Sequence, residues 1–232
     1  MKDDGFVDRT AAGRALADAV KNLKLQRPIL VLALPRGGVP VAYEVALALQ
    51  APLDVLVVRK IGMPGQPEFA IGALASGGII VREPGTHGHL AAMDAHFEQL
   101  AQRELAELER RERVYRPGLP PLDLRGQTVV LVDDGLATGA TMLAAVRAAR
   151  AAGAASVVVA APVGSDEAAA VVGAEADQLA IVEVPPLLFA IGAWYRNFEQ
   201  IEDADVRRLL ELAREKTAAG PPAQGGGNVL RH

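Results

Sequence analysis

Short apolar runs of strand length alternate with longer helical patterns along most of this 232-residue chain. Continuously apolar runs are typical of strands that are buried on both faces of a sheet. They span residues 29–34, 54–58, 128–132, 156–161 and 179–184, and helical patterns span residues 41–49, 141–152 and 165–173. This alternation predicts an α/β fold with a mostly parallel, twisted sheet flanked by helices on both faces.

Two segments interrupt the alternation. Residues 71–81, which contain Gly77 and Gly78, predict a hairpin or two short strands. Residues 90–115 predict a long charged helix with leucines on one stripe, which is either a solvated surface helix or a lid or dimer contact. With the proline-rich linker that follows, residues 85–125 or so form a helical insertion in one domain over residues 1–216. The low-complexity residues 217–232 predict a disordered tail.

The composition excludes several classes of protein. Half of the residues are hydrophobic, which is ample for a core, and the absence of cysteine excludes disulfides and thiolate metal sites. A net charge of −4 argues against an evenly basic nucleic-acid surface. No apolar stretch resembles a signal peptide or approaches the ~18 residues of a membrane span. We therefore expect a cytoplasmic protein with no membrane partner and no nucleic-acid partner.

The segment VVLVDDGLATGAT, residues 129–141, carries the strongest chemical signal. Asp133 and Asp134 follow a buried strand, and ligands of parallel sheets bind at the carboxyl ends of strands. Residues 137–141 begin the next helix, and their small side chains let a phosphate approach unpaired backbone N–H groups. The alternative is that Thr138 or Thr141 is simply a helix N-cap. Two adjacent buried acids favour a site that binds hydroxyl groups or a hydrated metal.

A second loop with the chemistry of a phosphate site ends the first strand, in the sequence LPRGG of residues 34–38. Gly37 and Gly38 permit backbone angles closed to other residues, and the Arg36 guanidinium suits phosphate oxygens. A plain strand-to-helix turn is the alternative. Arg59 and Lys60 end the second expected strand, where they either meet the same anion or cap the strand in solvent.

Residues 129–141 resemble the PRPP-binding motif of type I phosphoribosyltransferases, where PRPP is 5-phosphoribosyl 1-pyrophosphate. The resemblance implies that Asp133 and Asp134 hold the ribose 2′- and 3′-hydroxyls. It implies a 5-phosphate site made by Ala137, Thr138, Gly139, Ala140 and Thr141. The sequence departs from the motif at Gly135, where a branched apolar residue is usual, and at Ala137, where threonine is common.

The resemblance extends to the rest of the chain. It implies a pyrophosphate loop at Arg36, Gly37 and Gly38, often with a cis peptide, with Arg59 and Lys60 nearby. The catalytic set would be Asp133, Asp134, Arg36 and Lys60. Residues 63–69 would be a loop that closes over the site, with Glu68 as a candidate acid or base. Residues 184–201 would be a small hood over the acceptor, with a pocket formed by Phe189, Trp194, Tyr195 and Phe198. A core patch is the alternative for these aromatics.

The implied function is Mg²⁺-dependent transfer of phosphoribose from PRPP to a nitrogenous base or similar acceptor, in nucleotide metabolism. Mg²⁺ would be held mainly by PRPP with Asp133 and Asp134 nearby, and no protein cage is required. A homodimer is compatible with this interpretation. The chain resembles bacterial stand-alone phosphoribosyltransferase domain proteins of uncertain substrate. The alternatives are a non-catalytic PRPP- or nucleotide-sensing regulator and a hydrolase of a phosphorylated sugar. A nucleotide triphosphatase is excluded because the chain has no G-x-x-x-x-G-K-[ST] loop.

Overall fold

A five-stranded parallel sheet forms the centre of the computed structural model, which describes residues 5–63, 66–82 and 91–218. Its strands lie in the order β2-β1-β6-β7-β8. Their bounds are β1 Ile29–Ala33, β2 Leu53–Val55, β6 Thr128–Val132, β7 Ser156–Val163 and β8 Gln178–Glu183. The prediction of a parallel sheet is confirmed, and β6 has the bounds expected from the sequence.

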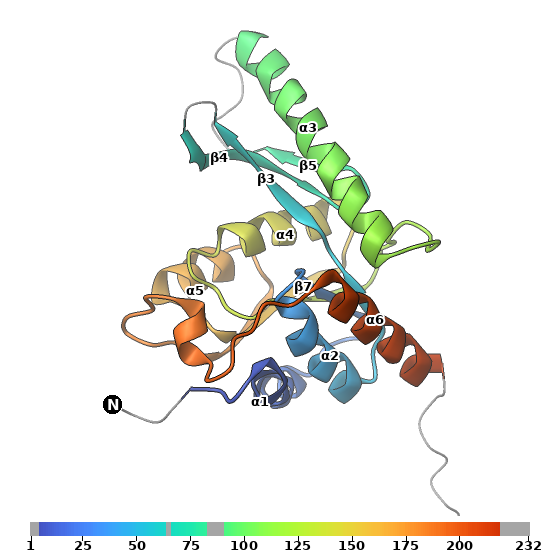
Figure 1. Cartoon of the computed structure of the whole chain (residues 1–232), viewed down its shortest axis with the longest axis vertical. Coiled ribbons are helices and arrows are strands. Elements are labelled where there is room, and N and C mark those ends of the chain that lie inside the picture. Colours follow the sequence, from blue (N-terminus) through green and yellow to red (C-terminus); the bar gives the residue numbers. More distant parts are fainter. Residues whose placement is uncertain (1–4, 64–65, 83–90, 219–232) are drawn as a thin grey trace, which may run out of the picture.

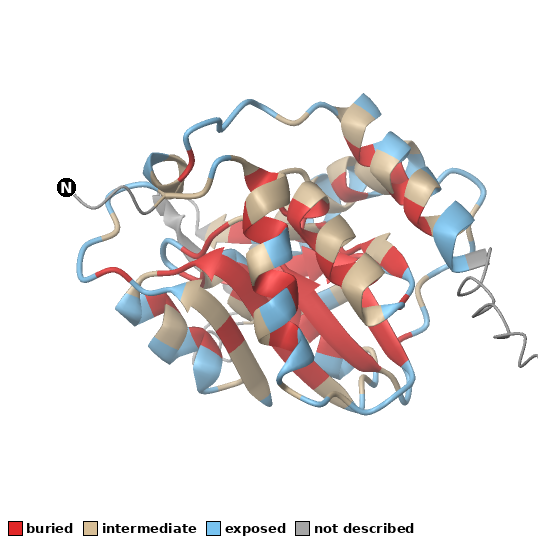
Figure 2. Cartoon of the chain, turned by 90° about the horizontal axis from the view of Figure 1, so that it is seen from below, coloured by how far each residue is buried: buried red, intermediate tan, exposed pale blue. Residues whose placement is uncertain are grey.

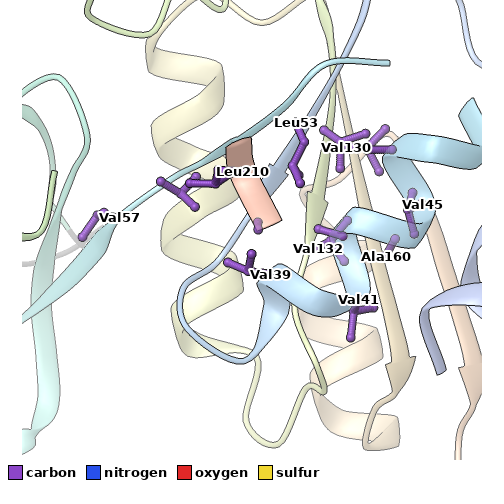
Figure 3. Packing of buried hydrophobic residues seen from close by; sticks show 14 of the residues in the cluster. Val39, Val41, Val45, Leu53, Val57, Val130, Val132, Ala160 and Leu210 are labelled. Atoms are coloured by element: carbon purple, nitrogen blue, oxygen red, sulfur yellow. The ribbon is translucent and has the colours of Figure 1, made fainter. Parts of the chain in front are cut away.

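Helices cover both faces of this sheet, because successive strand residues alternate between two apolar clusters. Val31 packs into a cluster with α1 (Arg9–Lys21), α2 (Gly38–Leu49) and α6 (Asp203–Ala218). Leu32 packs into a second cluster with α4 (Ala140–Ala151) and α5 (Asp166–Gly173). Figure 2 shows the buried strands between helices whose outer faces are exposed. In Figure 3, valines of α2 pack against Val130 and Val132 of β6 beside Leu210 of α6.

A smaller antiparallel sheet with the order β3-β4-β5 adjoins the core (Figure 1). It comprises β3 Val58–Met63, β4 Gln66–Ala75 and β5 Ile79–Arg82, and the pairing of Ala75 with Ile79 confirms the predicted hairpin. The long helix α3, Ala91–Tyr115, packs on β3 and β4, and α4 contacts the same sheet. Leu108 of α3 is fully buried, whereas Glu107 forms ion pairs with Arg110 and Arg111. The predicted helix therefore has both a buried face and a solvated face.

The strand expected at residues 54–58 is two strands that belong to different sheets. The Leu56 N–H donates to the Ala33 carbonyl of β1 at 3.0 Å, and the Val57 N–H then donates to Ser76 Oγ at 2.9 Å. The chain thus exchanges a partner in the parallel sheet for partners at the end of β4. The prediction of a single strand was wrong because an apolar run without a turn signal gives no indication of where its pairing partner changes.

Two helices that pack against α2 escaped the sequence analysis. Helix α1 begins after Asp8, whose carboxylate accepts from the Ala11 N–H at 2.7 Å, and α6 packs on α2 and β2. Residues 184–201, the expected hood, contain the short 3₁₀ helix η1, Ile191–Trp194. Of the tail expected over residues 217–232, residues 217–218 belong to the end of α6, and residues 219–232 lie outside the described residues. Among the described helices, none is long and apolar enough to cross a membrane.

We predict that Leu131→Ala in the centre of β6 lowers the free energy of unfolding by about 2–5 kcal/mol, because Leu131 is fully buried and its truncation leaves a cavity. Urea denaturation measures the change. Leu187→Ala is the matched control, since Leu187 is 69% exposed and its truncation leaves no cavity. Similar losses in the two variants would contradict the assigned core.

Candidate active site

The strand order brings the loops after β1 and β6 next to each other at one end of the sheet. From β1 the chain forms β2 on one side and later forms β6 on the other, so the order of the strands reverses between β1 and β6. Ala33 is in register with Val132, and the Leu34 N–H donates to the Val132 carbonyl at 2.8 Å. Ligands of open parallel sheets bind at such a switch point, outside the carboxyl ends of the strands.

Gly37 and Gly38 pack directly against the acid pair. A Cβ atom on Gly38 would lie 2.6 Å from the Val132 carbonyl oxygen, and one on Gly37 would overlap the Asp134 carboxylate. Gly37 has φ of −60°, which any residue adopts, and the Pro35–Arg36 peptide is cis. Gly38 is the first residue of the α-helix α2, so the expectation that these glycines supply unusual backbone angles was wrong for both. What the site requires there is the absence of a side chain.

The start of α4 lies beside the acid pair and has the geometry of an anion site. Its N-cap residue is Gly139, which has φ of +74° and no side chain to cap the helix. The Ala140 N–H donates a long hydrogen bond to Thr138 Oγ1 at 3.4 Å, and Thr141 is exposed in the first turn. Neither Thr138 nor Thr141 is therefore the N-cap residue of this helix. A helix start between small residues presents backbone N–H groups and the positive end of the helix dipole to a ligand.

The two acids differ in their partners. Asp134 Oδ2 accepts from Arg9 Nε at 2.8 Å, whereas Asp133 Oδ1 accepts from the Asp134 N–H at 2.9 Å. Burial, and then the charge of Asp134, raise the pKa of the Asp133 carboxyl well above its ordinary value. Burial also raises the pKa of Asp134, and the hydrogen bond and charge of Arg9 oppose that rise. The pair is therefore a poorly solvated acceptor for hydroxyl groups.

Arg9 is a component of the site that the sequence analysis missed. Besides Asp134, its guanidinium donates from Nη1 to the Glu199 carbonyl at 2.7 Å, and its central carbon lies 3.8 Å from the centroid of the Phe198 ring. One sequence signal could have indicated it. Arg9 is the first residue of α1, where the helix dipole disfavours a cation, so a basic residue there is better explained by a tertiary partner.

The hood residues are fixed onto the acid pair. The Tyr195 hydroxyl donates to the Asp134 carbonyl at 2.6 Å, and the Phe6 N–H donates to the Trp194 carbonyl at 2.8 Å. A Cβ on Gly135 would lie 2.6 Å from Ile191 Cγ2. Because Ile191 occupies the space where the usual motif carries a branched side chain, the departure at Gly135 has a packing reason.

The four hood aromatics do not form one pocket. Tyr195 is buried, and its ring centroid lies 5.0 Å from that of Phe198, beside Arg9. Trp194 is half-buried in η1, whereas Phe189 is 89% exposed. The structure therefore brings Tyr195 and Phe198 to the acid pair and leaves Phe189 at the surface.

The predicted cationic residues lie in three different settings. Arg36 directly precedes the glycines that pack on the acid pair, and its Nη1 is 3.8 Å from Glu202 and 3.7 Å from Asp203 of the α6 region. Arg59 lies inside β3 and pairs with Glu104 of α3 at 2.7 Å, so it does not end a strand of the parallel sheet. Lys60 is exposed on the same strand.

Most of the loop expected to close over the site, residues 63–69, is strand: Met63 ends β3 and residues 66–69 begin β4. Met63 and Gln66 pair at the ends of β3 and β4, and residues 64–65 between them are outside the described residues. The side chains of residues 63–70, which include Glu68, are outside them as well.

A metal at this site would find few protein ligands. Within residues 5–63, 66–82 and 91–218, no group of three or more histidine, aspartate, glutamate or cysteine side chains is arranged to hold an ion. Asp133 and Asp134 offer two carboxylates, and one of them is bound to Arg9. This donor set fits an ion carried in by a phosphorylated ligand, which supplies most of the coordination itself.

The strand order, the acid pair at the switch point and the start of α4 define an α/β protein with a candidate ligand site at the carboxyl ends of β1 and β6. A family model described as "Phosphoribosyl transferase domain" matches residues 8–177. The chain belongs to this family of transferases.

Relatives of known sequence or structure match most of this chain. Two proteins of Mycobacterium tuberculosis, from strains H37Rv and CDC 1551, are 48% identical to this chain over 217 residues. Both are provisionally named as phosphoribosyl transferases. The match covers 92% of this chain, and the chain spans about half (48%) of the length of these relatives. The crystal structure of TT1426 from Thermus thermophilus has 44% identity and a TM-score of 0.82, covering 89% of this chain and 97% of that one.

We predict that Gly37→Ala lowers the free energy of unfolding by about 1–3 kcal/mol, because the new methyl group displaces the Asp134 carboxylate in a packed site. Chemical denaturation measures the loss. Gly173→Ala in α5 is the control, since its Cβ would lie 3.6 Å from Leu179, an ordinary contact. If Gly37→Ala were as stable as its control, the close packing of the two loops would be refuted.

We predict that Asp133→Asn raises the melting temperature at pH 7. The folded-state pKa of Asp133 is raised, so its contribution to stability is complete below the unfolded pKa of about 3.9 and is lost as the pH rises through the folded-state pKa. Asparagine keeps an acceptor for the Asp134 N–H and carries no charge. The advantage of the variant should vanish when melting is measured near pH 4 and below. Asp18→Asn on the exposed side of α1 serves as the control, and a lower melting temperature for Asp133→Asn at pH 7 would contradict the assignment.

Proposed function

We propose that this protein transfers the phosphoribosyl group of PRPP to a nitrogenous base or similar acceptor and releases pyrophosphate. The observation that carries this proposal is the contact of Gly37 and Gly38 with the acid pair. It holds the loop that carries Arg36 against the two carboxylates, and the start of α4 follows these carboxylates along the chain. A pyrophosphate, a ribose diol and a 5-phosphate are the three groups that such a set would bind.

In this proposal the ribose 2′- and 3′-hydroxyls donate to Asp133 and Asp134. The 5-phosphate accepts from the backbone of residues 137–141 and from the hydroxyls of Thr138 and Thr141. Arg36, Lys60 and the Gly37 N–H bind the pyrophosphate. The Gly38 N–H already donates to the Leu34 carbonyl at 3.1 Å, so Gly38 would contribute through the close approach that its missing side chain allows. Arg36 would exchange Glu202 and Asp203 for pyrophosphate oxygens, and Arg59 would have to leave Glu104 to contribute.

The reaction is a displacement at C1 of the ribose. The bond between C1 and the pyrophosphate oxygen breaks with its electron pair on pyrophosphate, and an acceptor nitrogen forms the new bond to C1 and loses a proton. The ring passes through a cation-like state, as in glycoside chemistry. The protein orients the two reactants and stabilises charge on the departing group, so no covalent nucleophile is needed.

Mg²⁺ is part of the proposal as an ion held by PRPP oxygens, with Asp133 and Asp134 nearby. When bound, it would neutralise charge on the pyrophosphate group. We place the acceptor under residues 184–201. We further propose that residues 1–216 form one domain that acts in nucleotide metabolism. We place the protein in the cytoplasm, where it would form a homodimer. The chain spans about half of the length of its curated relatives, and the proposal concerns only the activity of this chain.

We predict that Asp133→Asn combined with Asp134→Asn abolishes PRPP binding, because an amide is a weaker acceptor for the ribose diol than a carboxylate. Calorimetric titration of PRPP with and without Mg²⁺ measures the binding, and wild type should bind in the micromolar range with Mg²⁺. Circular dichroism checks that the variant is folded.

The control for this experiment is Asp18→Asn combined with Glu211→Gln, which removes two exposed acids elsewhere on the molecule. It should bind PRPP like wild type. Unchanged PRPP affinity in the double asparagine variant, or no binding by wild type under either condition, would refute the proposal. PRPP binding without pyrophosphate release in a screen of bases would favour a sensor over an enzyme.

A further inference from the structure

Arg9 connects three parts of the molecule at the acid pair. It lies at the start of α1, it binds the Asp134 carboxylate after β6, and it holds Glu199 and Phe198 of the hood segment. The side chains of Arg9 and Asp134 are only 10% and 13% exposed, so the ion pair is shielded from water. A shielded pair is costly to break from one side, because the remaining charge is left buried and unpaired.

The contacts of Arg9 use the specific shape of a guanidinium. Nε donates to Asp134, Nη1 donates to the Glu199 carbonyl, and Cζ lies over the Phe198 ring at 3.8 Å from its centroid. An ammonium group is a compact charge that cannot make two directed bonds in one plane while stacking on a ring. Arginine at this position therefore does more than balance the charge of Asp134.

The hood is fixed to the same residue from its other side. The Tyr195 hydroxyl donates to the Asp134 carbonyl, and the Tyr195 and Phe198 rings are in contact. Asp134 is consequently held at its carboxylate by Arg9 and at its backbone by Tyr195. The 5-phosphate loop has separate supports, since the Ala137 carbonyl accepts from Ser165 and the Leu136 N–H donates to the Val163 carbonyl.

We propose that Arg9 is a positioning residue of the ribose site, which aims the Asp134 carboxylate at the sugar diol and clamps the hood segment beside it. This inference rests on the function proposed above. It assigns to the start of α1 a role in sugar recognition that is independent of phosphate recognition. The two halves of the ligand can therefore be tested separately.

The test compares two ligands, ribose 5-phosphate and inorganic phosphate, by calorimetry or by ³¹P NMR titration. In Arg9→Met the affinity for ribose 5-phosphate should fall about tenfold or more, by analogy with the loss seen when a residue that orients a metal ligand is removed. The affinity for inorganic phosphate should stay within about twofold, because the supports of the phosphate loop remain. Arg9→Lys should recover part of the ribose 5-phosphate affinity.

Two further variants guard against a general loss of structure. Arg14→Met on the same helix removes an exposed arginine that pairs with Glu44, and neither affinity should change. Phe198→Leu keeps the ion pair and removes only the ring next to the guanidinium, so it should lower the affinity for ribose 5-phosphate less than Arg9→Met does.

Each outcome has a distinct meaning. Equal losses for both ligands in Arg9→Met would mean that Arg9 acts on the fold, and unchanged affinity for ribose 5-phosphate would mean that it does not position Asp134. Either result overturns this inference alone, provided that wild type binds ribose 5-phosphate. Wild-type protein that binds phosphate but not ribose 5-phosphate would instead overturn the assignment of the acid pair, and with it the proposed function.

Discussion

Close backbone packing between the loop after β1 and the loop after β6 is the constraint on which the site depends. Gly38 lies against the Val132 carbonyl and Gly37 against the Asp134 carboxylate, at separations that leave no room for a Cβ. The parallel pairing of β1 with β6 imposes this approach, since Ala33 and Val132 are in register at the ends of their strands. The cationic loop, the acid pair and the start of α4 meet because these two strands are neighbours.

The acid pair makes this part of the molecule electrostatically unfavourable in the absence of a ligand. Burial raises the pKa of both carboxyls, and each sits next to a like charge. Arg9 compensates the charge of Asp134. Its guanidinium also donates to the Glu199 carbonyl and lies over the Phe198 ring, which is more than a single ion pair requires. Stability given up at one carboxylate is consistent with a site selected for binding, since functional sites commonly break local rules that the rest of a fold obeys.

The second sheet illustrates how tertiary pairing can override a sequence pattern. Residues 54–58 are apolar after Asp54 and predict one strand, yet the chain changes partners between Leu56 and Val57. As a result Arg59 lies inside an antiparallel sheet and faces Glu104 of α3, away from the end of the parallel sheet. The same change gives α3 a packing surface, which explains why a helix with so many charged residues still buries Leu108 completely.

The sequence by itself determined the fold class, most strand positions and the acid pair with its adjoining helix start. Those features are local, and each can be identified in the sequence without knowing what lies across the sheet. They are apolar runs of strand length, a pair of acids at a strand end and a loop of small residues. Only the tertiary structure decided the rest. Arg9 lies 125 positions from Asp134, and Tyr195 lies 61 positions from it on the other side, so no local pattern connects them. The reason that Gly37 must be glycine is likewise a neighbour distant in sequence, and such contacts exist only once β1 and β6 have paired.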